Sequence, residues 1–113
     1  MKVAIVGSRT FKNLDGIRKF IELLDRGTII ISGGAVGVDR CAEKKAKELG
    51  MRTLIFPANW DRYGKRAGFL RNQEIVKNSD YVIAFWDGTS KGTQHSINLA
   101  KEMNKKLIVI RDQ

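Results

Sequence analysis

A short run of isoleucines that leads directly into paired glycines limits the folds open to this chain more than any other feature. Residues 29–39 read Ile-Ile-Ile-Ser-Gly-Gly-Ala-Val-Gly-Val-Asp. An apolar, β-branched run before glycines and a helical pattern predicts a strand buried on both faces, a tight turn and a helix. Gly33 and Gly34 permit positive φ angles and close approach of a ligand, beside the free N–H groups of the helix start. The turn therefore either cradles a phosphate or only packs the helix against the strand.

The same unit of strand, loop and helix repeats along the whole chain. Strands are predicted at 2–6, 29–32, 52–56, 81–86 and 106–110, and helices at 13–25, 38–49, 66–78 and from residue 93 onward. Apolar strands that alternate with helices indicate a parallel sheet covered on both faces. We therefore predict an α/β fold with one domain over residues 1–113, a doubly wound, Rossmann-like parallel sheet of five strands.

Composition narrows the classes of function. The formal net charge of +9 favours an anionic partner without saying whether it is a nucleotide or a polynucleotide. The chain has no apolar segment long enough to span a membrane and begins directly with a strand, so we expect a cytoplasmic protein. Cys41 and His95 are the sole residues of their types, so no metal site and no cofactor is predicted, and Cys41 is interpreted as a buried structural thiol.

In a doubly wound sheet, ligands bind beyond the carboxyl ends of the strands. Four loops should open there, at 7–9, 32–39, 57–65 and 87–93, and all four carry glycine, hydroxyl or basic residues. The first lacks the G-x-G-x-x-G pattern of dinucleotide sites, and Gly64-Lys65 lacks the flanking residues of a P-loop, so NAD binding and ATP hydrolysis by those routes are not expected. The predicted ligand-binding residues are Gly7, Ser8, Arg9, Ser32, Gly33, Gly34, Ala35, Gly37, Asp39, Lys65, Arg71, Asn72, Asp87, Gly88, Ser90, Lys91, Gly92 and Thr93.

Each predicted role has a plain structural alternative. Arg9 offers a bidentate guanidinium clamp for phosphate or carboxylate, or is a surface arginine. Residues 32–35 and Gly37 should supply backbone N–H donors, whereas Asp39 either stabilises its helix start or binds a ribose. Lys65 and Arg71 are electrostatic contacts or salt-bridged surface groups.

The last helix and the aromatic residues carry similar alternatives. Residues 90–93 repeat the phosphate-binding pattern. The alternative is that Thr93 caps the helix. Trp60 and Trp86 either stack on a base or pack in the core or an interface. His95 is expected to hydrogen-bond near the helix start.

Several of these motifs, in this order, resemble the SLOG superfamily, the Rossmann-like group that joins the DNA-processing protein DprA with the Lonely-guy phosphoribohydrolases. The resemblance rests on Gly7-Ser8-Arg9, Ser32-Gly33-Gly34-Ala35 with Gly37-Val38-Asp39, Phe56-Pro57-Ala58 with Trp60, Gly64-Lys65, Arg71-Asn72, Asp87-Gly88 and Ser90-Lys91-Gly92-Thr93. It is strongest for the small stand-alone branch related to YspA and YpsA. It implies the strand order 3-2-1-4-5, a nucleotide or nucleotide-derived ligand at the carboxyl edge, and a homodimer.

The resemblance also implies two alternative functions. Arg71 with Asn72 matches the arginine motif of the phosphoribohydrolases, which cleave the N-glycosidic bond of a nucleoside 5′-monophosphate. The glutamate that follows their glycine-rich turn is missing, since His95 and Ser96 stand there, so Arg71, Asp39 and Asp87 are weak catalytic candidates. The first hypothesis is therefore binding or sensing of a nucleotide-derived ligand. The alternatives are phosphoribohydrolysis and DprA-like binding of single-stranded nucleic acid.

Overall fold

The computed structural model describes residues 1–112. The strands are β1 (Lys2–Gly7), β2 (Ile29–Ser32), β3 (Arg52–Ile55), β4 (Tyr81–Trp86) and β5 (Lys106–Arg111). The helices are α1 (Leu14–Glu22), α2 (Val38–Glu48), α3 (Trp60–Tyr63), α4 (Ala67–Lys77) and α5 (Lys91–Glu102), and the 3₁₀ turn η1 (Gly64–Arg66) joins α3 to α4. The strands form one parallel sheet in the order β3-β2-β1-β4-β5, which confirms the predicted fold class.

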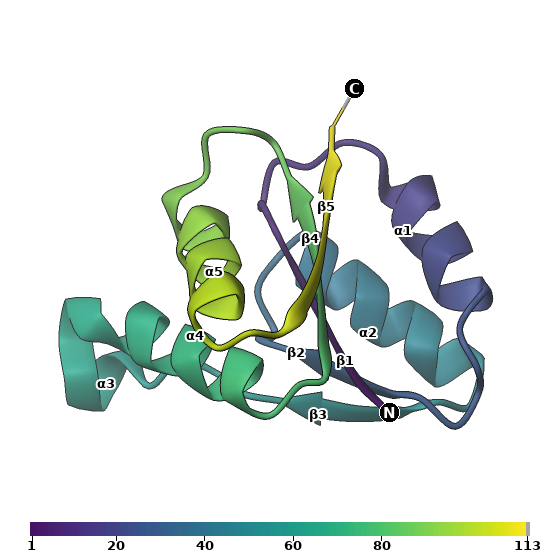
Figure 1. Ribbon diagram of the computed structural model, residues 1–113, viewed down its shortest axis with the longest axis horizontal. Helices are drawn as coiled ribbons and strands as arrows, with labels where there is room; N and C mark the ends of the chain where they lie inside the picture. The colour runs from purple at the N-terminus through teal and green to yellow at the C-terminus, as the bar shows by residue number, and fades with distance from the viewer. Residues whose placement is uncertain (113) are drawn as a thin grey trace.

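The direction of winding changes between β1 and β4. From β1 the chain moves outward through β2 to β3, with α1 and α2 on one side of the sheet, and it then returns to β4 and β5 with α4 and α5 on the other side (Figure 1). Val3 to Gly7 of β1 pair in register with Tyr81 to Phe85 of β4. The loops that leave these two strands diverge to opposite faces, which leaves room for a ligand above the sheet.

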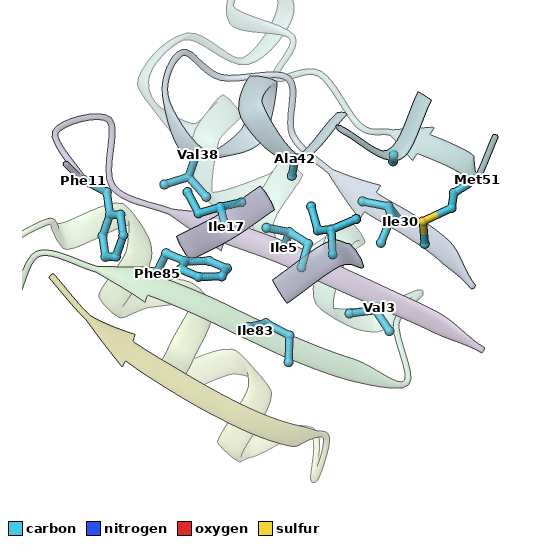
Figure 2. Close-up of a cluster of buried hydrophobic side chains, with 12 residues drawn as sticks. Val3, Ile5, Phe11, Ile17, Ile30, Val38, Ala42, Met51, Ile83 and Phe85 are labelled. Atoms are coloured by element: carbon cyan, nitrogen blue, oxygen red, sulfur yellow. The ribbon is translucent and has the colours of Figure 1, made fainter. Parts of the chain in front are cut away.

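Two apolar clusters hold the helices to the sheet. The cluster under α1 and α2 joins alternate residues of β1 and β4 to α2, and Figure 2 shows Ile5, Val38 and Phe85 within it. Ala4 and Val6 point to the opposite cluster under α4 and α5. Because β1 is buried on both faces from Val3 to Val6, the prediction of a doubly covered sheet is confirmed for its central strands.

The structure departs from the sequence-based expectations in three places. All four residues of β3 are exposed, because this strand lies at the sheet edge. The segment expected as a plain loop at 57–65 contains α3 and the start of η1, and the side chain of Asn59 caps α3 by accepting a hydrogen bond from the N–H of Arg62 at 3.1 Å. The first helix ends at Glu22 rather than near residue 25.

Two further expectations concern burial and membranes. Cys41 was expected to be buried but is only half-buried. Its Sγ lies 3.7 Å from the carbonyl oxygen of Leu14, and partial burial raises the pKa of its thiol. Across residues 1–112, the helices are all too short or too polar to cross a membrane.

Candidate functional site

One cavity of about 650 Å³ lies where the loops after β1, β2 and β3 meet the starts of α4 and α5. Most of the predicted ligand-binding residues line it, which places distant parts of the sequence at a single site as expected. These residues are Gly7, Arg9, Gly33, Gly34, Ala35, Asp39, Lys65, Arg71, Asn72, Ser90, Lys91, Gly92 and Thr93. The convergence follows from the parallel sheet, because every strand ends at the same edge.

The exposed lining residues form a rim that combines positive charge with aromatic surface. Arg9, Arg40, Lys65 and Lys91 supply the charge. Trp60 and Phe69 are 58% and 55% exposed, although large aromatic side chains are usually buried. The ion pairs found within residues 1–112 join Arg18 to Asp15 and Lys45 to Glu22 and Glu48, so the rim cations are left without carboxylate partners there.

The buried lining residues form an inner wall of different character. They are Val6, Gly33, Asp39, Ile75, Thr93 and Ser96. Val6, Gly33 and Ile75 give this wall apolar surface, and Asp39, Thr93 and Ser96 add a carboxylate and two hydroxyls. A ligand that enters the cavity therefore passes from a cationic, aromatic rim to a wall of mixed apolar and hydrogen-bonding groups.

Asp39 closes the glycine turn. Its Oδ2 accepts hydrogen bonds from the N–H groups of Gly33 and Ala35, each at 3.2 Å. Burial, the largest influence, raises the pKa of Asp39 to about 6 against the opposing effects of these hydrogen bonds and of Arg71. Two amides expected as free donors for a ligand are thus occupied by the protein's own carboxylate. Asp39 therefore holds the turn that precedes its helix, a contact that neither of its sequence-based alternatives described.

The two glycines of this turn have different roles. Gly34 has a φ of +73°, as the sequence predicts, but Gly33 is not among the residues with positive φ. A Cβ on Gly33 would lie 2.4 Å from Nη1 of Arg71 and 3.0 Å from Oδ2 of Asp39. Gly33 is therefore required by the space that these side chains occupy rather than by its backbone angles.

A chain of polar contacts links this turn to α4 and α5. Arg71 donates from Nη1 to the carbonyl oxygen of Gly33 at 2.8 Å and from Nε to Oδ1 of Asn72 at 3.1 Å. Nδ2 of Asn72 lies 3.2 Å from Nδ1 of His95. The imidazole also packs against Phe69 with the two rings perpendicular and their centroids 4.6 Å apart. The expected hydrogen bond of His95 near the helix start is confirmed, and burial lowers the pKa of its imidazole.

The start of α5 lines the cavity with residues 90–93. Ser90 is the N-cap: its Oγ accepts from the N–H of Thr93 at 3.5 Å, so the alternative that assigned the cap to Thr93 is wrong. Thr93 lies inside the helix and is buried, with its Oγ1 3.4 Å from Oγ of Ser8. The N–H groups of Lys91 and Gly92 precede the first intrahelical hydrogen bonds of α5 and face no carboxylate cap.

The remaining predicted residues lie behind the cavity lining and support its loops. Ser32 donates to Glu43 at 2.6 Å, and the backbone of Gly37 packs against that of Arg9. Asp87 accepts from Thr10, Thr89 and Ser90, and these hydrogen bonds lower the pKa of its carboxyl. Ser8 does not line the cavity but accepts from the N–H of Asp87, and Gly88 lies beneath the guanidinium of Arg111.

Trp86 belongs to the same supporting layer. Its Nε1 donates to the carbonyl oxygen of Ser90 at 3.1 Å, and the guanidinium carbon of Arg111 lies 5.2 Å from the ring centroid. Of the two tryptophans, Trp60 is therefore the one whose ring is available at the cavity.

Several lining residues were not among the ligand-binding residues predicted from the sequence. They are Val6, Val36, Arg40, Pro57, Ala58, Gly68, Phe69, Ile75 and Ser96. A helical pattern would have found some of them: Lys65, Gly68, Phe69 and Asn72 follow the i, i+3, i+4, i+7 spacing of one helix face. Arg40 and Ser96 carry no such signal, because single polar residues on a helix are ordinary surface positions.

A doubly wound parallel sheet, with a cationic cavity where the direction of winding changes between β1 and β4, defines a Rossmann-like domain. Residues 1–63 match the family described as DNA recombination-mediator protein A. Gene 61 protein of Mycobacterium phage D29 is 33% identical over 124 residues, which cover 99% of this chain and 98% of the relative. The chain therefore belongs to the DNA recombination-mediator protein A family, and the resemblance to the SLOG superfamily and DprA is confirmed.

Solved structures of two bacterial relatives share the fold. DNA processing protein A of Helicobacter pylori, which was described for its single-stranded DNA binding mode, superposes with a TM-score of 0.75 at 26% identity over 96% of this chain. DNA processing protein A of Streptococcus pneumoniae superposes with a TM-score of 0.81 at 24% identity, also over 96% of this chain. The chain spans 64% of the first protein and 49% of the second.

Proposed function

We propose that this protein binds single-stranded nucleic acid in the cavity at the carboxyl edge of its sheet. One observation carries the proposal: exposed aromatic rings and cations without carboxylate partners share a single rim. Single strands offer unpaired bases for stacking and phosphates for charge, and proteins that bind them combine the same two features.

The aromatic part of the rim has a rigid support. Trp60 packs over Gly68 of α4, where an added Cβ would lie 3.3 Å from Cη2 of the indole ring. Phe69 is the next residue after Gly68, and its ring packs perpendicular to the imidazole of His95. Rings held in this way can stack on bases with little loss of side-chain freedom on binding.

The charged part of the rim supplies phosphate contacts. Arg9, Arg40, Lys65 and Lys91 are exposed, and the N–H groups at the start of α5 add an electropositive helix end. Such contacts release counterions from the strand, so affinity should fall as salt is raised.

The comparisons add support from the family. The Helicobacter pylori relative was described as binding single-stranded DNA. That activity belongs to a longer chain, so its transfer to this protein is part of the proposal.

Fluorescence anisotropy with a labelled, mixed-sequence DNA single strand tests the proposal. Binding should weaken as salt rises, and Trp60→Ala should reduce affinity by about 1–3 kcal/mol, the range for removal of one base stack. Tyr63→Ala is the matched control, because Tyr63 lies on the same short helix, is exposed and does not line the cavity. Absence of a complex at low salt, or equal effects of the two variants, would overturn it.

A second candidate is a small nucleotide or nucleotide-derived ligand, because the cavity volume lies within the range of small-molecule sites. A panel of nucleotides should then raise the melting temperature of the wild type, whereas Arg9→Ala should lose the increase.

Phosphoribohydrolysis has less support. Within residues 1–112, Asp39 supplies the one carboxylate in the cavity lining, whereas glycosidic cleavage generally uses two. Release of free base from a nucleoside monophosphate would favour the hydrolase.

A further inference from the structure

Asp39 uses one carboxylate oxygen to hold the glycine turn and leaves the other free. Oδ2 accepts from the N–H groups of Gly33 and Ala35, whereas Oδ1 accepts no hydrogen bond from any group in residues 1–112. The residue is only 7% exposed and lines the cavity. Within residues 1–112, the buried side-chain atoms without a hydrogen-bond partner are limited to Oδ1 of Asp112, so Oδ1 of Asp39 is an acceptor that the cavity reaches. A ligand in the cavity can supply its missing hydrogen bond.

Ser96 makes a second, independent observation of the same kind. It is 2% exposed and lines the cavity, and its hydroxyl has no hydrogen-bond partner within the described part of the chain. The inner wall thus offers a ligand an acceptor on α2 and a hydroxyl on α5.

This wall is unsuited to phosphate. Arg71, the cation that most influences Asp39, already donates to the carbonyl oxygen of Gly33 and to the side chain of Asn72. A phosphate placed here would meet the Asp39 carboxylate and find the Gly33 and Ala35 amides taken. Phosphates therefore belong at the rim, and the uncharged part of a nucleotide belongs inside.

We propose that Asp39 is a specificity-determining residue that accepts a hydrogen bond from the exocyclic amino group of one nucleobase, which favours adenine, cytosine or guanine over thymine. This inference rests on the nucleic-acid binding proposed above and names the class of base that the inner wall selects, the bases with an exocyclic amino group. An ionised carboxylate is an acceptor only. Because burial raises the pKa of Asp39 to about 6, the group is ionised in mildly alkaline buffer.

Thymine fits this acceptor poorly. Its one N–H donor lies between two carbonyl oxygens, and a carboxylate that approaches it meets the repulsion of both. Adenine and cytosine present an amino group beside a ring nitrogen acceptor, and the free hydroxyl of Ser96 is of the type that such an acceptor requires.

Guest-base binding to the intact protein tests this selectivity. The probes are labelled oligothymidylates with one central guest position. The guest is adenine, purine without the 6-amino group, thymine or an abasic site. Fluorescence anisotropy is measured at about pH 8, above the pKa of Asp39. We expect the adenine guest to bind about tenfold more tightly than the amine-free purine or thymine, a typical discrimination for a well-placed base contact.

Asp39→Asn should remove the preference for adenine over amine-free purine, because its single amide oxygen is needed by the N–H groups of Gly33 and Ala35. The NH2 group, a donor, then faces the base in place of the acceptor. Glu43→Gln is the matched control: Glu43 lies on the same helix, accepts from Ser32 and does not line the cavity, so it should keep the preference. Equal affinity for all guests in the wild type overturns the inference and leaves single-strand binding intact. Absence of any complex instead removes the proposed function and this inference together, and the wild-type series decides the matter even if Asp39→Asn fails to fold.

Discussion

Nη1 of Arg71 donates a 2.8 Å hydrogen bond to the carbonyl oxygen of Gly33, although the two residues lie 38 positions apart. This contact ties α4, which carries Phe69 on the rim, to the turn that Asp39 closes from α2. The helices on opposite faces of the sheet are thereby joined at its carboxyl edge. We expect the shape of the cavity to depend on this contact.

Arg71→Ala should lower the free energy of unfolding by about 1.5–3 kcal/mol, because it removes a charged hydrogen bond and leaves a carbonyl group without its partner. Urea denaturation measures the loss. Arg66→Ala provides the control, since Arg66 is an exposed residue of η1 directly before the same helix and does not line the cavity. Equal stability of the two variants would show that Arg71 does not hold the turn.

Two glycine substitutions should have opposite effects on stability. Gly33→Ala forces a methyl group against Arg71 and Asp39 and should lower the melting temperature. Gly92→Ala meets nothing within 4 Å, lies inside α5 and does not have a positive φ. Because alanine favours helix, this second change should raise stability by up to about 1 kcal/mol. A destabilised Gly92→Ala would contradict the structure at the start of α5.

The buried carboxylate predicts a pH dependence of stability. Asp39 has its pKa raised from 3.8 to about 6, so the folded state holds a proton that the unfolded state releases between these values. Stability should therefore fall as pH rises through this window, by about 3 kcal/mol at most. Asp39→Asn should lack that decrease, as thermal unfolding of both proteins across the window would show. Parallel pH profiles would mean that Asp39 is not buried as described.

Salt dependence should identify the cations that contact phosphate. For a single strand, the slope of log affinity against log salt decreases by about 0.7 for each phosphate-binding cation that is removed. Lys65→Gln should reduce the slope by about this amount. Lys101→Gln removes the same charge from an exposed position away from the cavity and should leave the slope unchanged. If both variants change it equally, the effect reflects net charge alone.

The fold could be predicted because each strand and each of the four longer helices has its own local signal, whereas the short α3 was missed. Residues 29–32 are apolar and β-branched, glycines end the elements, and strands regularly alternate with helices. These signals also predict which loops share an edge, so Arg9, Gly34 and Lys91 were expected at one site, and all three line the cavity.

The use of individual groups within the site could not be predicted in the same way. Asp39 stands in the first turn of its helix, where sequence alone leaves capping and ligand binding equally open. Only the folded structure shows that its Oδ2 reaches back to Gly33 and Ala35. Trp60 and Trp86 likewise both lie near the carboxyl ends of strands, yet one ring lies at the cavity and the other packs under Arg111. The relation to YspA and the homodimer stay predictions.

Nuclear magnetic resonance of the two indole N–H groups tests the central claim most directly, because the chain has two tryptophans with opposite placements. When a DNA single strand is added to the labelled protein, the Trp60 signal should shift with increasing DNA. The Trp86 signal, whose N–H donates to Ser90, should change little. A Trp60 signal that stays in place while the strand is bound would show that nucleic acid does not occupy this cavity.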